Sequence, residues 1–162
     1  MQSIEKELVN FLKKNTTAVI ATTHQRLPYL STIYYVIDDK LSFFFITTKS
    51  TDKYLNLLKN DNVAMVIGSG PKHISAQLRG HAHIVYGKQK ENATKAIFAL
   101  HKKNKLKVVP IKDLKRLQSK NKPEEFIVFK VIPQQLNFMN LDDHDYPKSL
   151  SRDYHYILPR RA

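Results

Sequence analysis

The sequence predicts a mainly β fold, a β-barrel with α-helices, in which antiparallel strands close on themselves and helices lie at the ends and edges. Residues 74–84 alternate apolar and polar side chains with a strict period of two, as a strand with one buried face does. Shorter apolar segments separated by turns of three to five residues precede it and suit an antiparallel meander. Closing such strands into a barrel removes exposed edges, which makes it the economical arrangement.

Length and composition bound the function classes that the chain can serve. It has 162 residues, of which 42% are hydrophobic, and we expect a single domain over residues 1–162. The absence of cysteine excludes disulfides, thiolate metal sites and cysteine nucleophiles. No apolar run approaches the ~20 residues that span a bilayer, and residues 1–15 are amphipathic rather than signal-like. We therefore expect a cytoplasmic protein without a membrane partner.

The net charge of +13 is concentrated in one segment, because residues 101–122 hold nine Lys and Arg against one acid and so supply +8. Such a cluster attracts nucleic acid or an anionic surface, but it equally suits a solvated helix and loop. Platforms for single-stranded nucleic acid interleave aromatic side chains with basic ones, and this segment has no Phe, Tyr or Trp. That difference argues against a nucleic-acid partner.

Periodicity and turn residues predict the elements in order. A helix is expected at 3–14, because Ile4, Leu8 and Phe11 fall on one helical stripe. In the first half of the chain, strands are expected at 17–23, 29–37 and 41–47, with turns at 24–28 and 38–40 and a short helix at 52–59. In the second half, we expect strands at 62–68 and 74–84, helices at 91–103 and 112–120, and strands at 126–132 and 135–139 on either side of Pro133.

The junction between the strand ending at Thr47 and the helix at 52–59 is the most informative stretch. Hydroxyl side chains gather there, and Ser50 or Thr51 can cap the helix by accepting a hydrogen bond from one of its first amides. Lys53 adds an ammonium at the positive end of the helix dipole, so the junction suits an anion such as a phosphate. The same residues also fit an ordinary helix cap with a solvated lysine.

Two histidines at alternate positions of one predicted strand, His81 and His83, point to the same face and could grip a metal ion or haem. No third ligand stands at an obvious spacing, so the pair also fits a solvated or cleft-facing surface. We predict no metal site.

Four segments resemble the pyridoxamine 5'-phosphate oxidase-like, FMN-binding split barrels. Thr47, Thr51, Lys53, Asn56-Leu57 and 60–63 match the family's "T…S-x-K…N-L…N-P-x-V" signature. Residues 17–22 and 28–35 are similar to its first two barrel strands, and 78–82 to its "hydrophobic-x-G-x-A" strand. The chain looks closest to a small bacterial branch in which an Arg-Gly strand follows a Gly-rich turn and Pro-Lys. The resemblance covers about 4–140, the expected core, and leaves a tail at 141–162.

The resemblance implies an antiparallel split β-barrel that is homodimeric, with FMN in two clefts between subunits. Lys53 and Thr51 would hold the FMN phosphate, and Ser31, Thr32 and Ile33 would run along the ring and ribityl chain. The outward face of the strand at 74–84 would approach the ring from the second subunit, through Ser75 or Gln77. The cofactor-binding set is completed by the hydroxyl residues of the junction, Thr47, Thr48 and Ser50.

Departures from the family pattern bear on the reaction. Asp52 stands where the family often has Arg, and the strand at 29–37 lacks the basic residues of authentic pyridoxamine phosphate oxidases. We therefore expect an FMN-binding flavoprotein that is an oxidoreductase of some other small molecule, acting by flavin hydride or electron transfer. The alternative is a split-barrel module that binds or senses flavin or haem without catalysis.

The C-terminal segment is too apolar for a free end, because it carries Tyr146, Tyr154, Tyr156, Ile157 and Leu158. We expect residues 146–159 to fold back over the partner subunit or the cleft.

Overall fold

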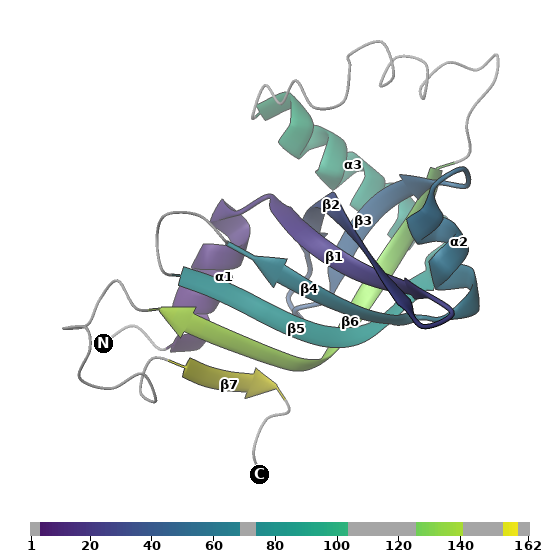
Figure 1. The fold of residues 1–162 in the computed structure, drawn as a ribbon. Helices are drawn as coiled ribbons and strands as arrows, with labels where there is room; N and C mark the ends of the chain where they lie inside the picture. Colours follow the sequence, from purple (N-terminus) through teal and green to yellow (C-terminus); the bar gives the residue numbers. More distant parts are fainter. Residues whose placement is uncertain (1–3, 69–73, 104–125, 141–153, 159–162) are drawn as a thin grey trace.

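Six antiparallel strands close into a barrel and three helices accompany them within the residues that the computed structural model describes, 4–68, 74–103, 126–140 and 154–158 (Figure 1). The barrel strands are β1 (Thr17–His24), β2 (Leu27–Ile37), β3 (Phe43–Thr48), β4 (Asn62–Ile67), β5 (Ile74–Ile84) and β6 (Phe126–Asn140). The helices are α1 (Ile4–Lys14), α2 (Asp52–Lys59) and α3 (Gly87–Lys103).

The barrel closes through a ladder between β3 and β6. The strands follow one another in the order β3-β2-β1-β4-β5-β6, and β3 then pairs with β6 from Phe43↔Val131 to Thr48↔Phe126. Every pairing is antiparallel. This architecture confirms the predicted mainly β class, an antiparallel split barrel with helices. Dimerisation remains a prediction, because the structure holds a single chain.

Aromatic side chains fill the barrel interior. Phe45 and Phe129 stack with their ring centroids 5.5 Å apart, and both side chains are buried. Helix α1 covers one end with Leu8 and Leu12, while its Phe11 ring lies 5.5 Å from that of Phe138. Each such side chain contributes about 1.5–3 kcal/mol when it is fully buried. The interior is therefore a packed core, and a ligand site must lie outside it.

Strand β3 is buried on both of its faces. Phe43 and Phe45 point into the barrel, whereas Phe44 packs on the outside against Val85, Ala93 and Val128. Helix α3 contributes Ala93 to this second cluster, so it covers β3 and β6 from outside. Burial of both faces explains why the apolar run at 43–46 shows no alternation.

Strand β6 corrects the prediction of two strands separated by Pro133. It runs unbroken from Phe126 to Asn140 and pairs with β5 from Phe129 to Asn140, with a register shift where Gly80 lies opposite Pro133. Proline lacks an amide proton, and a bulge tolerates that loss. Pro133 also lies between two ladders of β6. The ladder with β3 ends at Phe43↔Val131, and the ladder with β7 begins at Leu136↔Leu158, so neither includes Pro133.

Several predicted boundaries were also wrong. The turn at 24–28 is shorter than expected, because β1 and β2 pair up to His24↔Leu27 and leave a two-residue connection. Gln25 there has a φ of 54°, a conformation that the sequence does not signal with Gly or Asn. Strand β3 starts at Phe43 rather than Leu41, since the Asp38 carboxylate accepts from the amides of Lys40 and Ser42 and holds the turn.

The outer parts of the chain give a mixed result. Helix α3 starts at Gly87 rather than at residue 91. Its first turn holds no acidic residue, which is a usual sequence signal for the start of a helix. Residues 154–158 form a further strand, β7 (Tyr154–Leu158), which pairs with β6 of the same chain (Figure 1). The helix predicted at 112–120 and most of the basic segment at 101–122 lie outside the described residues. None of the described helices is long and apolar enough to cross a membrane.

Candidate functional site

The junction between β3 and α2 gathers hydroxyl groups around the start of the helix. Thr51 is the N-cap, with φ −91° and ψ 144°, and its side chain accepts from the Tyr54 amide at 3.3 Å. The hydroxyl oxygens of Thr47 and Thr51 lie 2.7 Å apart, and those of Thr48 and Ser50 lie 3.0 Å apart. The sequence prediction of a capped helix at a hydroxyl-rich junction is confirmed.

The Thr51 hydroxyl is fully engaged within the chain. It donates to the Thr48 carbonyl at 3.0 Å, so the 2.7 Å contact with Thr47 leaves Thr47 as the donor. A hydroxyl has one proton and two lone pairs, and all three are then used. The first-turn amides of Asp52 and Lys53 have capacity left for an anion, because a helix has no carbonyl partner for them. The Thr48–Ser50 pair adds one hydroxyl proton, since the other is used in the hydrogen bond between them.

Lys53 lies in the first turn of α2 and is half-buried. Burial lowers the pKa of Lys53 below its ordinary value, because desolvation disfavours the ammonium form. Among the residues that the structure describes, no carboxylate pairs with it. The neighbouring Asp52 side chain is exposed to solvent, as suits an acid at the positive end of a helix. The junction therefore presents an ammonium whose charge the described residues do not neutralise.

Two amide side chains fix α2 to the end of β1. Asn56 is buried and donates to the Thr22 hydroxyl at 3.0 Å. Asn60 donates to the Thr23 hydroxyl at 2.7 Å. Leu57 packs into the core from the same helix. These contacts position the first turn of α2, and with it Lys53, relative to the barrel.

The predicted residues of β2 lie where β2 and β3 part. The ladder between these strands runs from Ile37↔Phe43 to Tyr35↔Phe45 and goes no further. Ser31 and Thr32 of β2 therefore have no pairing partner on β3. Thr47 and Thr48 of β3 pair only with β6. Ser31 is half-buried and Thr32 is exposed, but the Ile33 side chain is buried in the core and offers only its backbone to a ligand.

The predicted residues of β5 lie elsewhere on the barrel. Going round the closed sheet in either direction, two strands separate β5 from β2. Ser75 is buried opposite Met139, whereas Gln77 is exposed between Val66 and Asn137. The β3–α2 hydroxyls and Lys53 thus follow the strand from which β2 parts, and Ser75 and Gln77 lie on a strand that two others separate from β2.

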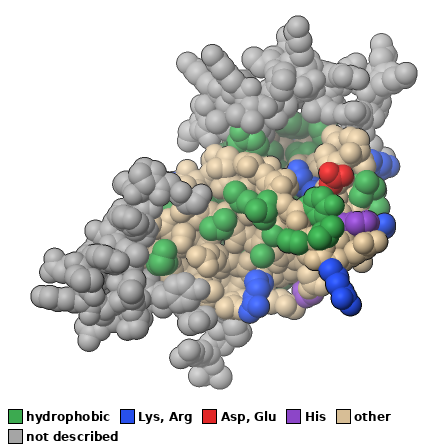
Figure 2. Space-filling view, viewed as in Figure 1, with side chains coloured by type: hydrophobic (Ala, Val, Ile, Leu, Met, Phe, Trp, Pro, Cys, Tyr) green, Lys and Arg blue, Asp and Glu red, His purple; other side chains and the backbone are tan. Residues whose placement is uncertain are grey.

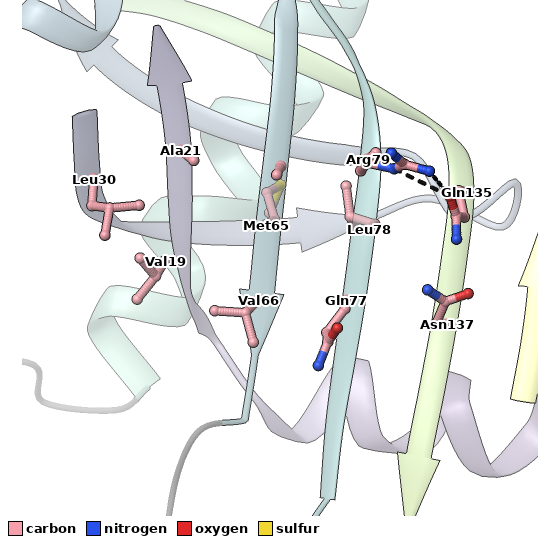
Figure 3. Close-up of a pocket in the computed structure, with 11 residues that line it drawn as sticks. Val19, Ala21, Leu30, Met65, Val66, Gln77, Leu78, Arg79, Gln135 and Asn137 are labelled. Carbon is pink, nitrogen blue, oxygen red and sulfur yellow. Dashed lines mark hydrogen bonds between the residues drawn. The ribbon is translucent and has the colours of Figure 1, made fainter. Parts of the chain in front are cut away.

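An open groove of about 560 Å³ lies on the outer face of the sheet, and sequence reasoning did not predict it (Figure 3). Figure 2 shows hydrophobic side chains gathered across the middle of this face, with Lys and Arg side chains along its lower edge. The groove crosses five strands, from Leu30 on β2 to Gln135 and Asn137 on β6. The only advance signal was the alternation of β5, which placed Gln77 and Arg79 on the outward face.

His81 does not join a metal cluster. Its Nδ1 lies 3.3 Å from an oxygen of Asp61, and His83 is exposed two residues further along β5. Within the described ranges, no group of three or more His, Cys, Asp or Glu side chains is placed to hold a metal ion.

The sequence of the chain matches a known protein family over most of its length. Residues 4–140 match the family described as pyridoxamine 5'-phosphate oxidase. No curated protein is similar to the chain at a significant level.

Solved structures resemble the fold at low sequence identity. A Listeria innocua protein named after pyridoxamine 5'-phosphate oxidase has 17% identity and a TM-score of 0.64, covering 85% of this chain and 99% of its own. General stress protein 26 of Bacillus anthracis has 17% identity and a TM-score of 0.62, covering 83% and 92%. An FAD-binding protein of Mesorhizobium loti has 14% identity and a TM-score of 0.59, covering 84% and 92%. The fold agrees with the family match over residues 4–140, and the chain therefore belongs to the pyridoxamine 5'-phosphate oxidase family.

Proposed function

We propose that this chain is a flavoprotein that binds FMN, with the phosphate at the β3–α2 junction, and that it acts as an oxidoreductase of a small molecule. The observation that carries the proposal is Lys53, a half-buried ammonium without a carboxylate partner among the described residues. A phosphate group supplies the missing negative charge and accepts several hydrogen bonds at once. When it is bound, FMN supplies hydride and electron transfer.

The donor set of the junction fits a phosphate group. Lys53 would contribute its ammonium, the Thr48–Ser50 pair one hydroxyl proton, and the first turn of α2 its free amides. Thr47 and Thr51 would hold the turn in shape through their shared hydrogen bond rather than contact the phosphate. Ser31, Thr32 and the backbone of Ile33 would flank the ribityl chain and ring where β2 and β3 part.

The remaining residues of the proposed site require a second copy of the chain. Ser75 and Gln77 lie on the opposite part of the barrel from β2, so they can reach a flavin at β2 only from another subunit. The family resemblance and this separation together support a homodimer with flavin between the subunits. The Mesorhizobium loti protein of similar fold is described as FAD-binding, which supports a flavin as the ligand class.

Titration of the flavin-free protein with FMN tests the proposal. Flavin fluorescence and the absorption bands near ~370 and ~450 nm report binding. Lys53→Ala removes a charge-assisted contact, worth about 1.5–3 kcal/mol, and should weaken FMN binding about ten- to hundredfold. Lys59→Ala is the matched control, because it removes an exposed lysine from the last turn of the same helix. Equal affinities for the two variants would exclude the assigned phosphate position.

The non-catalytic alternative has one specific feature in its favour. Asp52 stands beside Lys53, and β2 carries no basic residue to add a second cation. Anaerobic mixing of the FMN-loaded protein with NADH or NADPH separates the two functions. Bleaching of the ~450 nm band on a timescale of seconds would support an oxidoreductase, whereas bound flavin that stays oxidised would favour a binding module.

A further inference from the structure

The two parts of the proposed flavin site, on β2 and on β5, determine how two copies of this chain would meet. Strands β1 and β4 lie between them on one side of the barrel, and on the other side α3 covers β3 and β6. The outer face of β1 and β4 is therefore the seam between the subunits. Two sheets can meet face to face about a two-fold axis that runs along the strands or across them. An axis across the strands would place β2 over the partner's β2, whereas an axis along the strands, between β1 and β4, places β2 over the partner's β5.

A two-fold axis along the strands keeps every residue at its own level, so rows of cross-strand neighbours in one copy lie over the same rows in the other. In such a dimer Leu30 faces the partner's Arg79, and Thr32 faces the partner's Gln77. Thr32 and Gln77 both belong to the proposed flavin site, so their meeting supports this axis. The two rows run Leu30, Ala21, Ala64, Arg79, Gln135 and Thr32, Val19, Val66, Gln77, Asn137.

The middle of the seam is suited to close approach of two copies. Ala21 and Ala64 form a low shelf beside the axis, and Val19 and Val66 flank it in the neighbouring row (Figure 3). The outer faces of two barrels are convex, so they touch in the middle and diverge toward β2 and β5. A second copy would thus close the middle of the groove and leave a cleft on each side, at the two flavin positions.

The Arg79 side chain points away from the axis. Its Nε donates to the Oε1 of Gln135 at 3.1 Å, and its Nη2 donates to the same oxygen, so the guanidinium leans from β5 toward β6 (Figure 3). In the dimer the partner's β6 lies beyond its β5, over the place where β2 and β3 part. The described residues offer Arg79 no carboxylate, and a guanidinium has five N–H donors, so several remain for a ligand.

The β3–α2 junction lies at the level of Arg79. The ladder between β2 and β3 ends at Tyr35↔Phe45, and continuing its register past that pair sets Ser50 level with Leu30. Leu30 belongs to the same row as Arg79. The partner's guanidinium therefore comes over the hydroxyl residues that precede α2, where the proposed function puts the phosphate.

We infer that Arg79 of the partner subunit supplies a second cation to the FMN phosphate, alongside Lys53 of the first subunit. A phosphate monoester carries close to two negative charges at neutral pH. Lys53 is the one Lys or Arg in the first turn of α2, Asp52 precedes it, and β2 holds no basic residue. A guanidinium can bind two phosphate oxygens through parallel hydrogen bonds. Each phosphate site is then incomplete without the second copy, an inference that rests on the proposed function.

Affinities of the full-length protein for FMN and for riboflavin, which lacks the phosphate, test the role of Arg79. Arg79→Gln should weaken FMN about five- to tenfold and leave riboflavin within about twofold. Arg79→Lys keeps a cation and should lose less. Arg26→Gln, in the exposed β1–β2 connection, removes the same charge and should change neither affinity.

A mixed dimer tests whether Arg79 acts across the seam. Chains carrying Lys53→Ala and chains carrying Arg79→Gln are co-expressed with different affinity tags, and the dimer that holds both tags is purified. If Arg79 acts in the partner's site, both lesions fall in one site and the other site is intact. Half of the sites should then bind FMN with the wild-type affinity, although each variant alone binds it weakly.

The outcomes separate this inference from the flavin proposal. Wild-type protein that does not distinguish FMN from riboflavin would overturn both. A wild-type preference for FMN that survives in Arg79→Gln would overturn the inference alone. A mixed dimer in which neither site regains the wild-type affinity would show that Arg79 does not act across the seam, and a monomer by light scattering would exclude it as well.

Discussion

The side-chain amide of Asn56 donates to the hydroxyl of Thr22 at 3.0 Å, between two buried residues that are 34 positions apart. This hydrogen bond joins the middle of α2 to the end of β1. The helix is short, and isolated helices of this length are unstable, so tertiary contacts must hold it. The position of Lys53 thus depends on a contact that lies one helical turn away from it.

Replacing Asn56 by alanine should destabilise the protein. The change leaves the Thr22 hydroxyl buried without a partner, at an expected loss of about 1–3 kcal/mol in the free energy of unfolding. Urea denaturation measures the loss. The double variant Thr22→Val, Asn56→Ala removes both polar groups and should lose less than the sum of the single variants. Strict additivity of the two single losses would show that the hydrogen bond contributes nothing.

Gly80 should tolerate no side chain. A Cβ at this position would lie 2.2 Å from the Ile132 carbonyl oxygen, at the register shift where β6 passes Pro133. Because the obstacle is backbone, relief requires the two strands to move apart, and we expect Gly80→Ala to cost about 3 kcal/mol.

Gly87 provides the control for that prediction. A Cβ there meets nothing within 4 Å, but its φ is +57°, so Gly87→Ala should cost only about 1 kcal/mol. Thermal denaturation of the two variants compares the losses. A larger loss for Gly87→Ala than for Gly80→Ala would refute the close contact between β5 and β6.

Lys53 should lower the free energy of unfolding of the flavin-free protein at neutral pH. Its pKa is lowered by burial, so the unfolded chain binds the proton more tightly than the folded chain does. Stability should then rise with pH between the lowered pKa and the ordinary value of about 10.4. Lys53→Met lacks this group and should be more stable than the wild type at pH ~8, with a smaller advantage at pH ~10.

Urea midpoints at the two pH values measure this difference. An advantage of Lys53→Met that does not shrink as the pH rises would contradict a desolvated ammonium at this position. A residue that destabilises the empty protein and strengthens ligand binding is a common feature of functional sites.

Local patterns predicted the barrel and the junction well. The strict alternation of 74–84 placed Gln77 and Arg79 outward, and the hydroxyls before Lys53 predicted the capped helix. The groove could not be predicted, because its shelf exists only where register sets Ala21 beside Ala64 and Ala64 beside Arg79. The predicted break in the strand at Pro133 was wrong for a related reason. The missing amide is tolerated at a bulge opposite Gly80, which is distant in the sequence.

The affinity difference between FMN and riboflavin tests the central claim most directly. The two ligands differ only in the phosphate group, which the β3–α2 junction is proposed to hold. Wild-type protein should bind FMN about ten- to hundredfold more tightly than riboflavin, and Lys53→Ala should remove most of that difference while riboflavin binding stays unchanged. If Lys53→Ala weakened both ligands equally, or if the wild type did not distinguish them, the phosphate site would lie elsewhere.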